Sequence, residues 1–229
     1  MVAGLREKTR IEENFGRHVG ERIARRILAR DRGLGGVEEE TTVLFLDIRD
    51  FTARAAAAPP ARIVALLNLF LAEMVEVIEQ RHGGIVNKFL GDGLMALFGA
   101  WTGREDHADA ALAAGAEMLA RLGAINARLA VDGEAPLAIG IGIHSGRAVV
   151  GSIGSPRRME YTAIGDAVNV ASRVEGLTKT LREPLLFTAA TLAGLRHPVS
   201  AVAHPPQSVK GQVEPVAVYA PRAESDTSG

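Results

Sequence analysis

The stretch VNKFLGDGLMALF (residues 86–98) decides the fold more than any other part of this sequence. Two short apolar runs, residues 86–89 and 94–98, flank a turn of two glycines around Asp92. Apolar runs on either side of a Gly/Asp turn are typical of a β-hairpin. The pattern therefore predicts two antiparallel strands with Asp92 near the tip of their connection.

The segments on both sides of this hairpin alternate between strand and helix patterns. Before it, a buried strand over residues 43–46 precedes an amphipathic helix that Pro59 and Pro60 open and Gly83 and Gly84 end. After it, the pattern predicts a helix over 106–129, strands over 137–143 and 147–164, a helix from Asp166 to about residue 180, a strand over 185–187, a short helix after Thr188 and a closing hairpin over 210–219. This mixture with adjacent hairpins favours an α+β fold over a doubly wound parallel sheet.

Composition limits the function classes. The chain has 229 residues, 47% of them hydrophobic, which is enough for one sizeable core. With 26 basic and 27 acidic residues, it has no net charge that would favour nucleic acid or an anionic membrane. The absence of cysteine excludes disulfides and thiolate metal sites. The longest apolar run, residues 63–78, contains two glutamates, so we expect no membrane span and a cytoplasmic protein, or a cytoplasmic domain of a larger one.

The N-terminal 36 residues carry a basic surplus and one apolar stripe. Phe15, Val19, Ile23 and Ile27 recur at every fourth position, which predicts an amphipathic helix. This helix either docks on its own domain or serves dimerisation and signal transmission.

Two aspartates are candidate metal ligands. Asp47 ends a buried apolar strand, where a carboxylate is costly unless it is exposed or paired with a cation. Asp92 lies at the hairpin turn. Carboxylates on adjacent strand ends can hold hard cations that bridge substrate phosphates, although an Asp in a turn is commonly only a turn residue.

Two further segments have both a functional and a structural interpretation. Residues 48–52 can form a turn whose backbone N–H groups face a phosphate, or an ordinary strand-to-helix connection. Asn169 and Arg173 lie at i and i+4 of a helix and share one face, which is either part of a site or a solvated surface.

Four strings carry a family resemblance: FLDIRDFT (45–52), NKFLGDGLMALFG (87–99), GIHSGRAVVGSIG (142–154) and YTAIGDAVNVASR (161–173). Together, in this order, they resemble the catalytic domain of class III adenylate cyclases over about residues 37–220. The resemblance implies a ferredoxin-like βαββαβ core with extra C-terminal strands. It also implies an N-terminal helix and linker over 1–36, a nucleotide cyclase catalytic domain over 37–220 and a disordered tail over 221–229, in a chain that can be part of a larger sensor protein.

The resemblance also implies a mechanism and its residues. The enzyme would convert ATP to 3',5'-cyclic AMP and pyrophosphate in a head-to-tail homodimer, with two divalent metal ions, Mg or Mn, at each composite site. The implied ligands are Asp47, Asp92 and the backbone carbonyl of Ile48 for the metals; Lys88 and Thr162 for adenine; Asn169 and Arg173 for the ribose and the reacting phosphate; Arg147 and Lys210 for the pyrophosphate end; and Phe51 and Thr52 for the substrate. The partner chain would supply the adenine-binding pair and the Asn169 and Arg173 groups.

The substrate base is argued from Lys88 and Thr162. A lysine can donate to adenine N1 and a threonine hydroxyl can accept from the exocyclic amine, whereas guanine presents a donor at N1. Family members that make cyclic GMP resemble one another in having Glu and Cys at these two places. Many adenylate-specific members have Asp where Thr162 stands and others have Thr, so ATP is favoured.

Two alternatives remain. A diguanylate cyclase is suggested by the GDG turn, but it does not explain the NVASR string at residues 169–173. A catalytically inactive regulatory domain would lack a metal Asp or Arg173, and all of these positions are filled. His144, although inside the GIHSG string, is expected to be a packed histidine and no acid or base.

Overall fold

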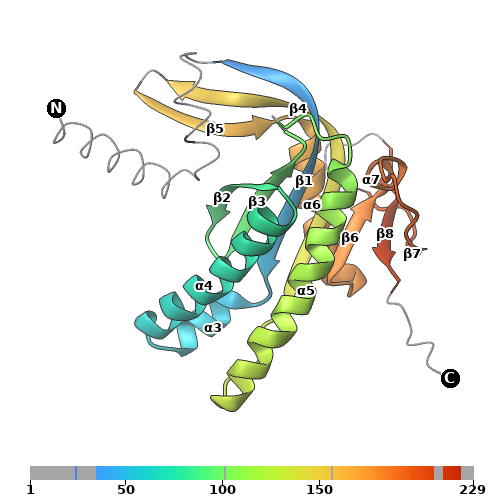
Figure 1. The fold of residues 1–229 in the computed structure, drawn as a ribbon. Helices are drawn as coiled ribbons and strands as arrows, with labels where there is room; N and C mark the ends of the chain where they lie inside the picture. Colours follow the sequence, from blue (N-terminus) through green and yellow to red (C-terminus); the bar gives the residue numbers. More distant parts are fainter. Residues whose placement is uncertain (1–23, 25–34, 101, 156, 209–213, 223–229) are drawn as a thin grey trace.

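The computed structural model describes residue 24 and residues 35–100, 102–155, 157–208 and 214–222 of the protein (Figure 1). Lys210 lies outside the described residues. The predicted N-terminal helix and linker also lie outside them, except for Ala24, Gly35 and Gly36. None of the helices in these ranges combines the length and the apolar character that a membrane crossing needs.

The first part of the chain forms a four-stranded antiparallel sheet with helices between its strands. In chain order the elements are β1 (Gly35–Ile48), α3 (Phe51–Ala57), α4 (Pro60–Val75), the π-helical turn η1 (Glu76–Arg81), β2 (Ile85–Leu90), β3 (Gly93–Phe98), α5 (His107–Val131) and β4 (Ile139–Ser155). The strands lie in the order β2-β3-β1-β4, and each is antiparallel to its neighbour. This is the βαββαβ arrangement of a ferredoxin-like core, and it confirms the predicted fold class.

The rest of the chain widens this sheet. It comprises β5 (Arg158–Ile164), α6 (Asp166–Leu181), β6 (Leu185–Thr188), α7 (Ala189–Ala193), β7 (Ala201–Ala203) and β8 (Val218–Pro221). Strand β6 adds parallel to β4, and β8 and β7 follow in antiparallel pairing, while β5 pairs with the outer half of β4. The extra C-terminal strands that the family resemblance implies are therefore present, and the described strands form one eight-stranded sheet, but β8 pairs with β7 at 201–203 and not within a hairpin over 210–219.

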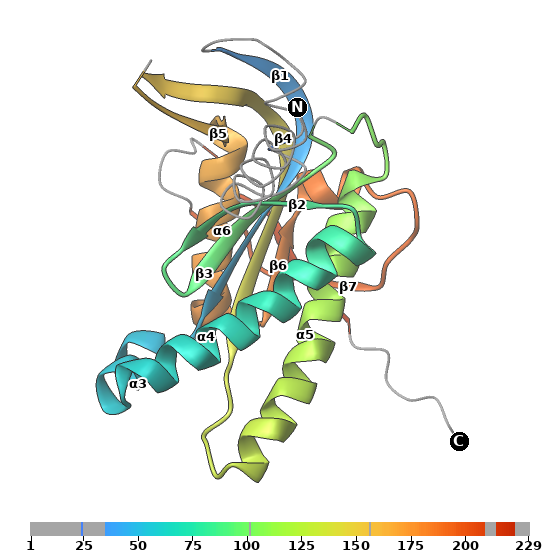
Figure 2. The same cartoon turned by 60° about the vertical axis from the view of Figure 1, so that its left-hand side comes forward.

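Both faces of the sheet are covered by helices, which Figure 2 shows with α4 and α5 on one side and α6 on the other. In β1, Leu44 and Leu46 pack in the cluster that includes α4 and α5, whereas Val43 and Phe45 pack with α6. Successive strand residues point to opposite faces. The same alternation assigns Asp47 and Arg49, at the end of β1, to the side of α6.

Helix α6 lies unusually close to β4. A Cβ atom placed on Gly142 of β4 would be 2.0 Å from the backbone nitrogen of Glu175 and 2.5 Å from its Cα. Because both neighbours are backbone atoms, no side chain fits at this position without moving the helix. Gly142 thus sets the separation between helix and sheet.

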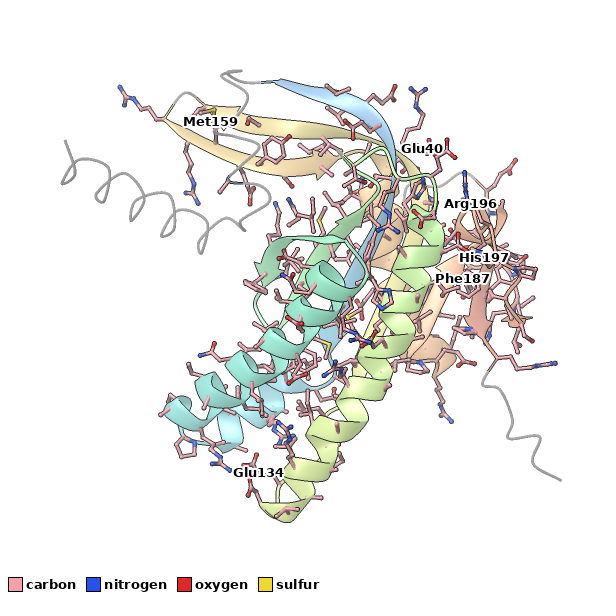
Figure 3. All side chains as sticks on the ribbon, viewed as in Figure 1. Glu40, Glu134, Met159, Phe187, Arg196 and His197 are labelled. Atoms are coloured by element: carbon pink, nitrogen blue, oxygen red, sulfur yellow. The ribbon has the colours of Figure 1, made fainter. Side chains whose placement is uncertain are left out.

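The β4–β5 hairpin and the start of β1 extend beyond the helices (Figure 1). Figure 3 shows Met159 on this hairpin and Glu134 at the opposite end of the molecule, past α5. The hairpin and strand β2, at the edge of the sheet, bear exposed apolar side chains: Val149, Met159, Ile164, Phe89 and Leu90. A surface of this kind is typical of a protein interface.

Several boundaries differ from those expected from the sequence. The linker was expected to end at residue 36 and the first strand to cover 43–46, but β1 already begins at Gly35, which pairs with Ser152 of β4. The segment after Asp50 forms helix α3. Gly165, not Asp166, is the N-cap of α6, and Pro221 still belongs to β8.

Candidate functional site

Asp47 and Asp92 lie at adjoining ends of the central strands β1 and β3. The register pairs Leu46 with Leu94, so Asp47 falls opposite Gly93, the residue after Asp92. A Cβ atom on Gly93 would be 2.3 Å from the carbonyl oxygen of Leu46 and 3.0 Å from Oδ1 of Asp47. The close approach that brings the two carboxylates together therefore requires glycine at position 93.

The electrostatics of this pair fit a divalent cation. Burial raises the pKa of Asp47, the charge of Asp92 raises it further, and Arg49 lowers it. In the described ranges no cluster of three or more metal-ligating side chains occurs. Two carboxylates nevertheless suit hard ions that take the rest of their ligands from substrate phosphates and water. Two carboxylates of like charge repel each other, and a bound cation would stabilise both in their ionised form.

A buried ion pair lies beside the aspartates. Nη1 of Arg49 is 3.1 Å from Oε1 of Glu175 on α6, and both side chains are largely buried. Burial raises the pKa of Glu175, Arg49 lowers it, and Asp47 raises it. A Cβ on Gly140 would be 1.8 Å from Nη2 of Arg49, so this glycine provides the space for the guanidinium. The ion pair connects the Asp47 end of β1 to α6.

The two predicted base-binding residues lie on β2 and β5, which do not pair with each other in the sheet but are joined by side-chain contacts. Nζ of Lys88 is 2.9 Å from Oε1 of Glu160. The buried Thr162 donates its hydroxyl proton to Oδ1 of Asn87 over 2.9 Å, and Nδ2 of Asn87 donates to the carbonyl oxygen of Tyr161 over 2.8 Å. These two hydrogen bonds connect Asn87 to residues that are 74 and 75 positions away in the sequence.

Asn169 and Arg173 lie on the outward face of α6, since Val170, Ala171 and Val174 are the buried positions around them. Asn169 is exposed and Arg173 is half-buried. Neither side chain makes a hydrogen bond or ion pair with another described residue. No such contact joins them to Asp47 or Asp92 in the described part of the chain.

The predicted phosphate-end residues are more dispersed. Arg147, on β4, is exposed and its Nη2 is 2.8 Å from Oε2 of Glu38. Phe51 and Thr52 open the short helix α3 after Asp50, whose φ of 55° is left-handed. Phe51 is buried and Thr52 is exposed, so the backbone and not the phenyl ring is the group of Phe51 that can face a ligand.

His144 fits the expectation of a packed histidine. Its Nδ1 is 2.8 Å from the hydroxyl oxygen of Thr188, and burial lowers its pKa. Three residues near the site were not singled out from the sequence: Arg49, Asn87 and Glu175. The first two lie inside recognised strings, where a polar side chain within an apolar run was the available signal. Glu175 had none, because its buried position becomes visible only once α6 lies on the sheet.

Comparison with known proteins agrees with this geometry. Residues 36–219 match the family model described as the adenylate and guanylate cyclase catalytic domain. An uncharacterized Mycobacterium tuberculosis protein is 40% identical over 189 residues, which cover 82% of this chain and 33% of that protein. A second one is 39% identical over 195 residues, covering 85% of this chain and 33% of that protein. The chain spans about a third of the length of these relatives.

Solved structures are similar over most of the domain. A guanylyl cyclase crystal structure has a TM-score of 0.77 and 33% identity, covering 85% of this chain and 98% of the other. The adenylyl cyclase CyaB from P. aeruginosa has a TM-score of 0.77 and 31% identity, covering 86% and 100%. A bacterial light-regulated adenylyl cyclase has a TM-score of 0.83 and 26% identity, covering 96% and 63%. The chain belongs to the family of adenylate and guanylate cyclase catalytic domains.

Proposed function

We propose that this cyclase domain converts ATP to 3',5'-cyclic AMP and pyrophosphate at sites shared by two copies of the chain. The observation that supports the choice of ATP is that β2 and β5, which carry Lys88 and Thr162, are joined by the Thr162–Asn87 hydrogen bond and the Lys88–Glu160 ion pair. Related structures include both adenylyl and guanylyl cyclases, so the base is argued from these side chains alone.

Adenine and guanine differ at the two positions that such a pair would contact. Adenine has an acceptor at N1, which a lysine ammonium can satisfy, and an exocyclic amine that donates to a hydroxyl oxygen. Guanine has a donor at N1 and an acceptor at O6. Lys88 opposite a guanine N1–H would place two donors together, which costs affinity because neither is satisfied.

Asp47 and Asp92, with the backbone carbonyl of Ile48, would hold two divalent ions, Mg or Mn. Such ions, when bound, lower the pKa of a hydroxyl group and neutralise phosphate charge. Asp47 and Asp92 would orient the triphosphate with respect to the ribose 3'-oxygen, which attacks the α-phosphate as pyrophosphate departs.

The remaining residues would act on the phosphates and the sugar. Arg173 has the planar, permanently charged group suited to the charge that grows on the α-phosphate, and Asn169 would hold the ribose. Arg147 would exchange its ion pair with Glu38 for the pyrophosphate end, together with Lys210. The backbone N–H groups at the start of α3, at Phe51 and Thr52, would contact the triphosphate.

A head-to-tail homodimer would complete the site. The side chains of Asn169 and Arg173 make no polar contact with another described residue of their own chain, and the β4–β5 hairpin and β2 present exposed apolar side chains. We propose that one chain supplies the metal-binding pair and the other supplies the base-binding pair with Asn169 and Arg173. The residues before β1 would be a regulatory or dimer-associated segment of a larger sensor protein.

The test is complementation between inactive chains. Turnover of ATP and of GTP is measured with Mg and with Mn, and then for a mixture of Asp47→Ala and Arg173→Ala chains. Random pairing makes about half of the dimers mixed, each with one intact site, so about a quarter of wild-type activity should return. An Asp47→Ala and Asp92→Ala mixture is the control, because both changes damage the same half-site and no activity should return.

Three outcomes would contradict the proposal. Preferred turnover of GTP refutes the choice of substrate. Failure of the first mixture to recover activity refutes the shared sites. Absence of turnover in a dimeric wild-type protein would favour the alternative of a nucleotide-binding regulatory domain.

A further inference from the structure

Asn87 occupies an irregular position next to the base-binding lysine. The pairing of β2 with β3 shifts register between Val86 and Lys88, so Asn87 is the bulged residue between them. A bulge turns a side chain away from the regular alternation of the strand. Here it lets the Asn87 amide reach across to β5, where it bonds to both Tyr161 and Thr162.

The direction of each of these hydrogen bonds is fixed by chemistry. The backbone carbonyl oxygen of Tyr161 can only accept, so the group that faces it over 2.8 Å must be the NH₂ of Asn87. The amide oxygen of Asn87 then faces Thr162 and can also only accept. The hydroxyl proton of Thr162, 2.9 Å away, is consequently committed to Asn87.

A threonine whose proton is committed can offer only its lone pairs to a ligand. The exocyclic amine of adenine donates hydrogen bonds and is compatible with that state, whereas O6 of guanine needs a donor. For Thr162 to donate to guanine, it must leave the amide oxygen of Asn87 unsatisfied. Thr162 is 6% exposed and Asn87 is half-buried, so water replaces the lost bond only in part.

We propose that Asn87 is a specificity-determining residue, which selects adenine by holding the Thr162 hydroxyl as an acceptor. This inference rests on the proposed function, because it assumes that Thr162 contacts the base. Asn87 itself need not touch the nucleotide: it acts as a positioning residue through Thr162. The chemical class selected is a purine with an amino group, and not a carbonyl group, at the six position.

The variants separate this role from a structural one. Asn87→Leu removes both bonds at similar volume, whereas Asn87→Asp loses the donor to Tyr161 but keeps an acceptor for Thr162. Asn126→Leu is the matched control: Asn126, on helix α5, also makes two hydrogen bonds through its amide, to the carbonyl and the N–H of Leu137. Each variant is measured for kcat/KM with ATP and with GTP under the same metal, with circular dichroism and Tm to establish folding.

We expect Asn87→Leu to lower the ATP-to-GTP ratio of kcat/KM by about five- to tenfold, the effect of one unsatisfied buried group. Asn87→Asp should keep most of the wild-type ratio, and Asn126→Leu should lower Tm without changing the ratio. Thr162→Val should lower the ratio by itself, and Asn87→Leu added to it should lower the ratio no further, because the two residues act as one unit.

The inference is wrong if folded Asn87→Leu keeps the wild-type ratio, if Asn87→Asp loses it as fully as Asn87→Leu, or if Asn87→Leu has the same effect with and without the Thr162 hydroxyl. These outcomes are distinct from failure of the proposed function. A wild-type protein that prefers GTP refutes the adenylate proposal, whereas one that prefers ATP while Asn87→Leu shows the same preference refutes only the role of Asn87.

Discussion

Replacing Gly93 with alanine should disturb catalysis through the backbone alone. The added Cβ would be 2.3 Å from the carbonyl oxygen of Leu46, whereas real Cβ contacts are essentially never under 3.0 Å. The difference, 3.0 − 2.3 = 0.7 Å, is the least by which β1 and β3 must separate. Because Leu46 contributes a backbone atom, no side-chain rotation can relieve the overlap, and the separation occurs where Asp47 and Asp92 meet.

Two magnitudes follow from this shift. Overpacking of a well-packed contact costs about 1 to 3 kcal/mol of unfolding free energy. A displacement of about 1 Å at reacting groups can cost about a hundredfold in rate, so a shift somewhat smaller should lower kcat by some tens of fold. We expect the concentration of Mn needed for half-maximal activity to rise as well, since both proposed ligands move apart.

The assay combines steady-state kinetics over a Mn titration with urea unfolding of the same preparations. Gly123→Ala is the control, because a Cβ on Gly123, in helix α5, meets nothing within 4 Å. That change should raise stability by about 0.5 to 1 kcal/mol and leave activity unaltered. Folded Gly93→Ala with kcat and Mn dependence within about twofold of wild type would refute the reasoning from strand separation.

Two further predictions concern charge beside the strand ends. Burial and Asp92 raise the folded-state pKa of Asp47, so the folded protein holds this proton more tightly than the unfolded chain does. The ionised carboxylate of Asp47 therefore lowers the free energy of unfolding. This loss of stability is absent below the unfolded-state pKa and complete above the folded-state pKa. Asp47→Asn should therefore abolish turnover yet make the metal-free protein more stable, by an amount that grows as the pH rises above the unfolded-state pKa of about 4. Urea unfolding in chelator will measure this gain, and a variant less stable than wild type at neutral pH contradicts it. Arg49→Met leaves Glu175 buried without its cation and should lower the free energy of unfolding by about 2 to 4 kcal/mol. The double variant, Arg49→Met with Glu175→Leu, should recover much of this loss. Equal losses of stability in the single and double variants would contradict the coupling.

Local patterns in the sequence were sufficient for the hairpin around Asp92 and for most of the helices and strands. The turn composition at residues 91–93 and the apolar runs beside it determine strand, turn and strand without help from distant residues. The ferredoxin-like order of β1 to β4 came from the family resemblance and is confirmed.

Features that depend on distant partners were missed. Residues 35–40 have the glycine and glutamate composition of a linker, and they form a strand because β4 supplies hydrogen-bonding partners more than a hundred positions away. The candidate site also divides into residues that local strings identify and contacts that only the folded chain creates. Asp47, Asp92, Lys88 and Thr162 could be named from their strings, but the Arg49–Glu175 ion pair and the bonds of Asn87 exist only after α6 and β5 have taken their places.

The closeness of α6 to Gly142 bears on how such a domain could be switched. With backbone against backbone, the helix that carries Arg173 cannot approach its own strand any more closely. A signal arriving from elsewhere in a longer protein could not act by pressing this helix further onto the sheet. In the proposed homodimer it would act by reorienting one chain against the other, so that the active and inactive states differ in quaternary arrangement.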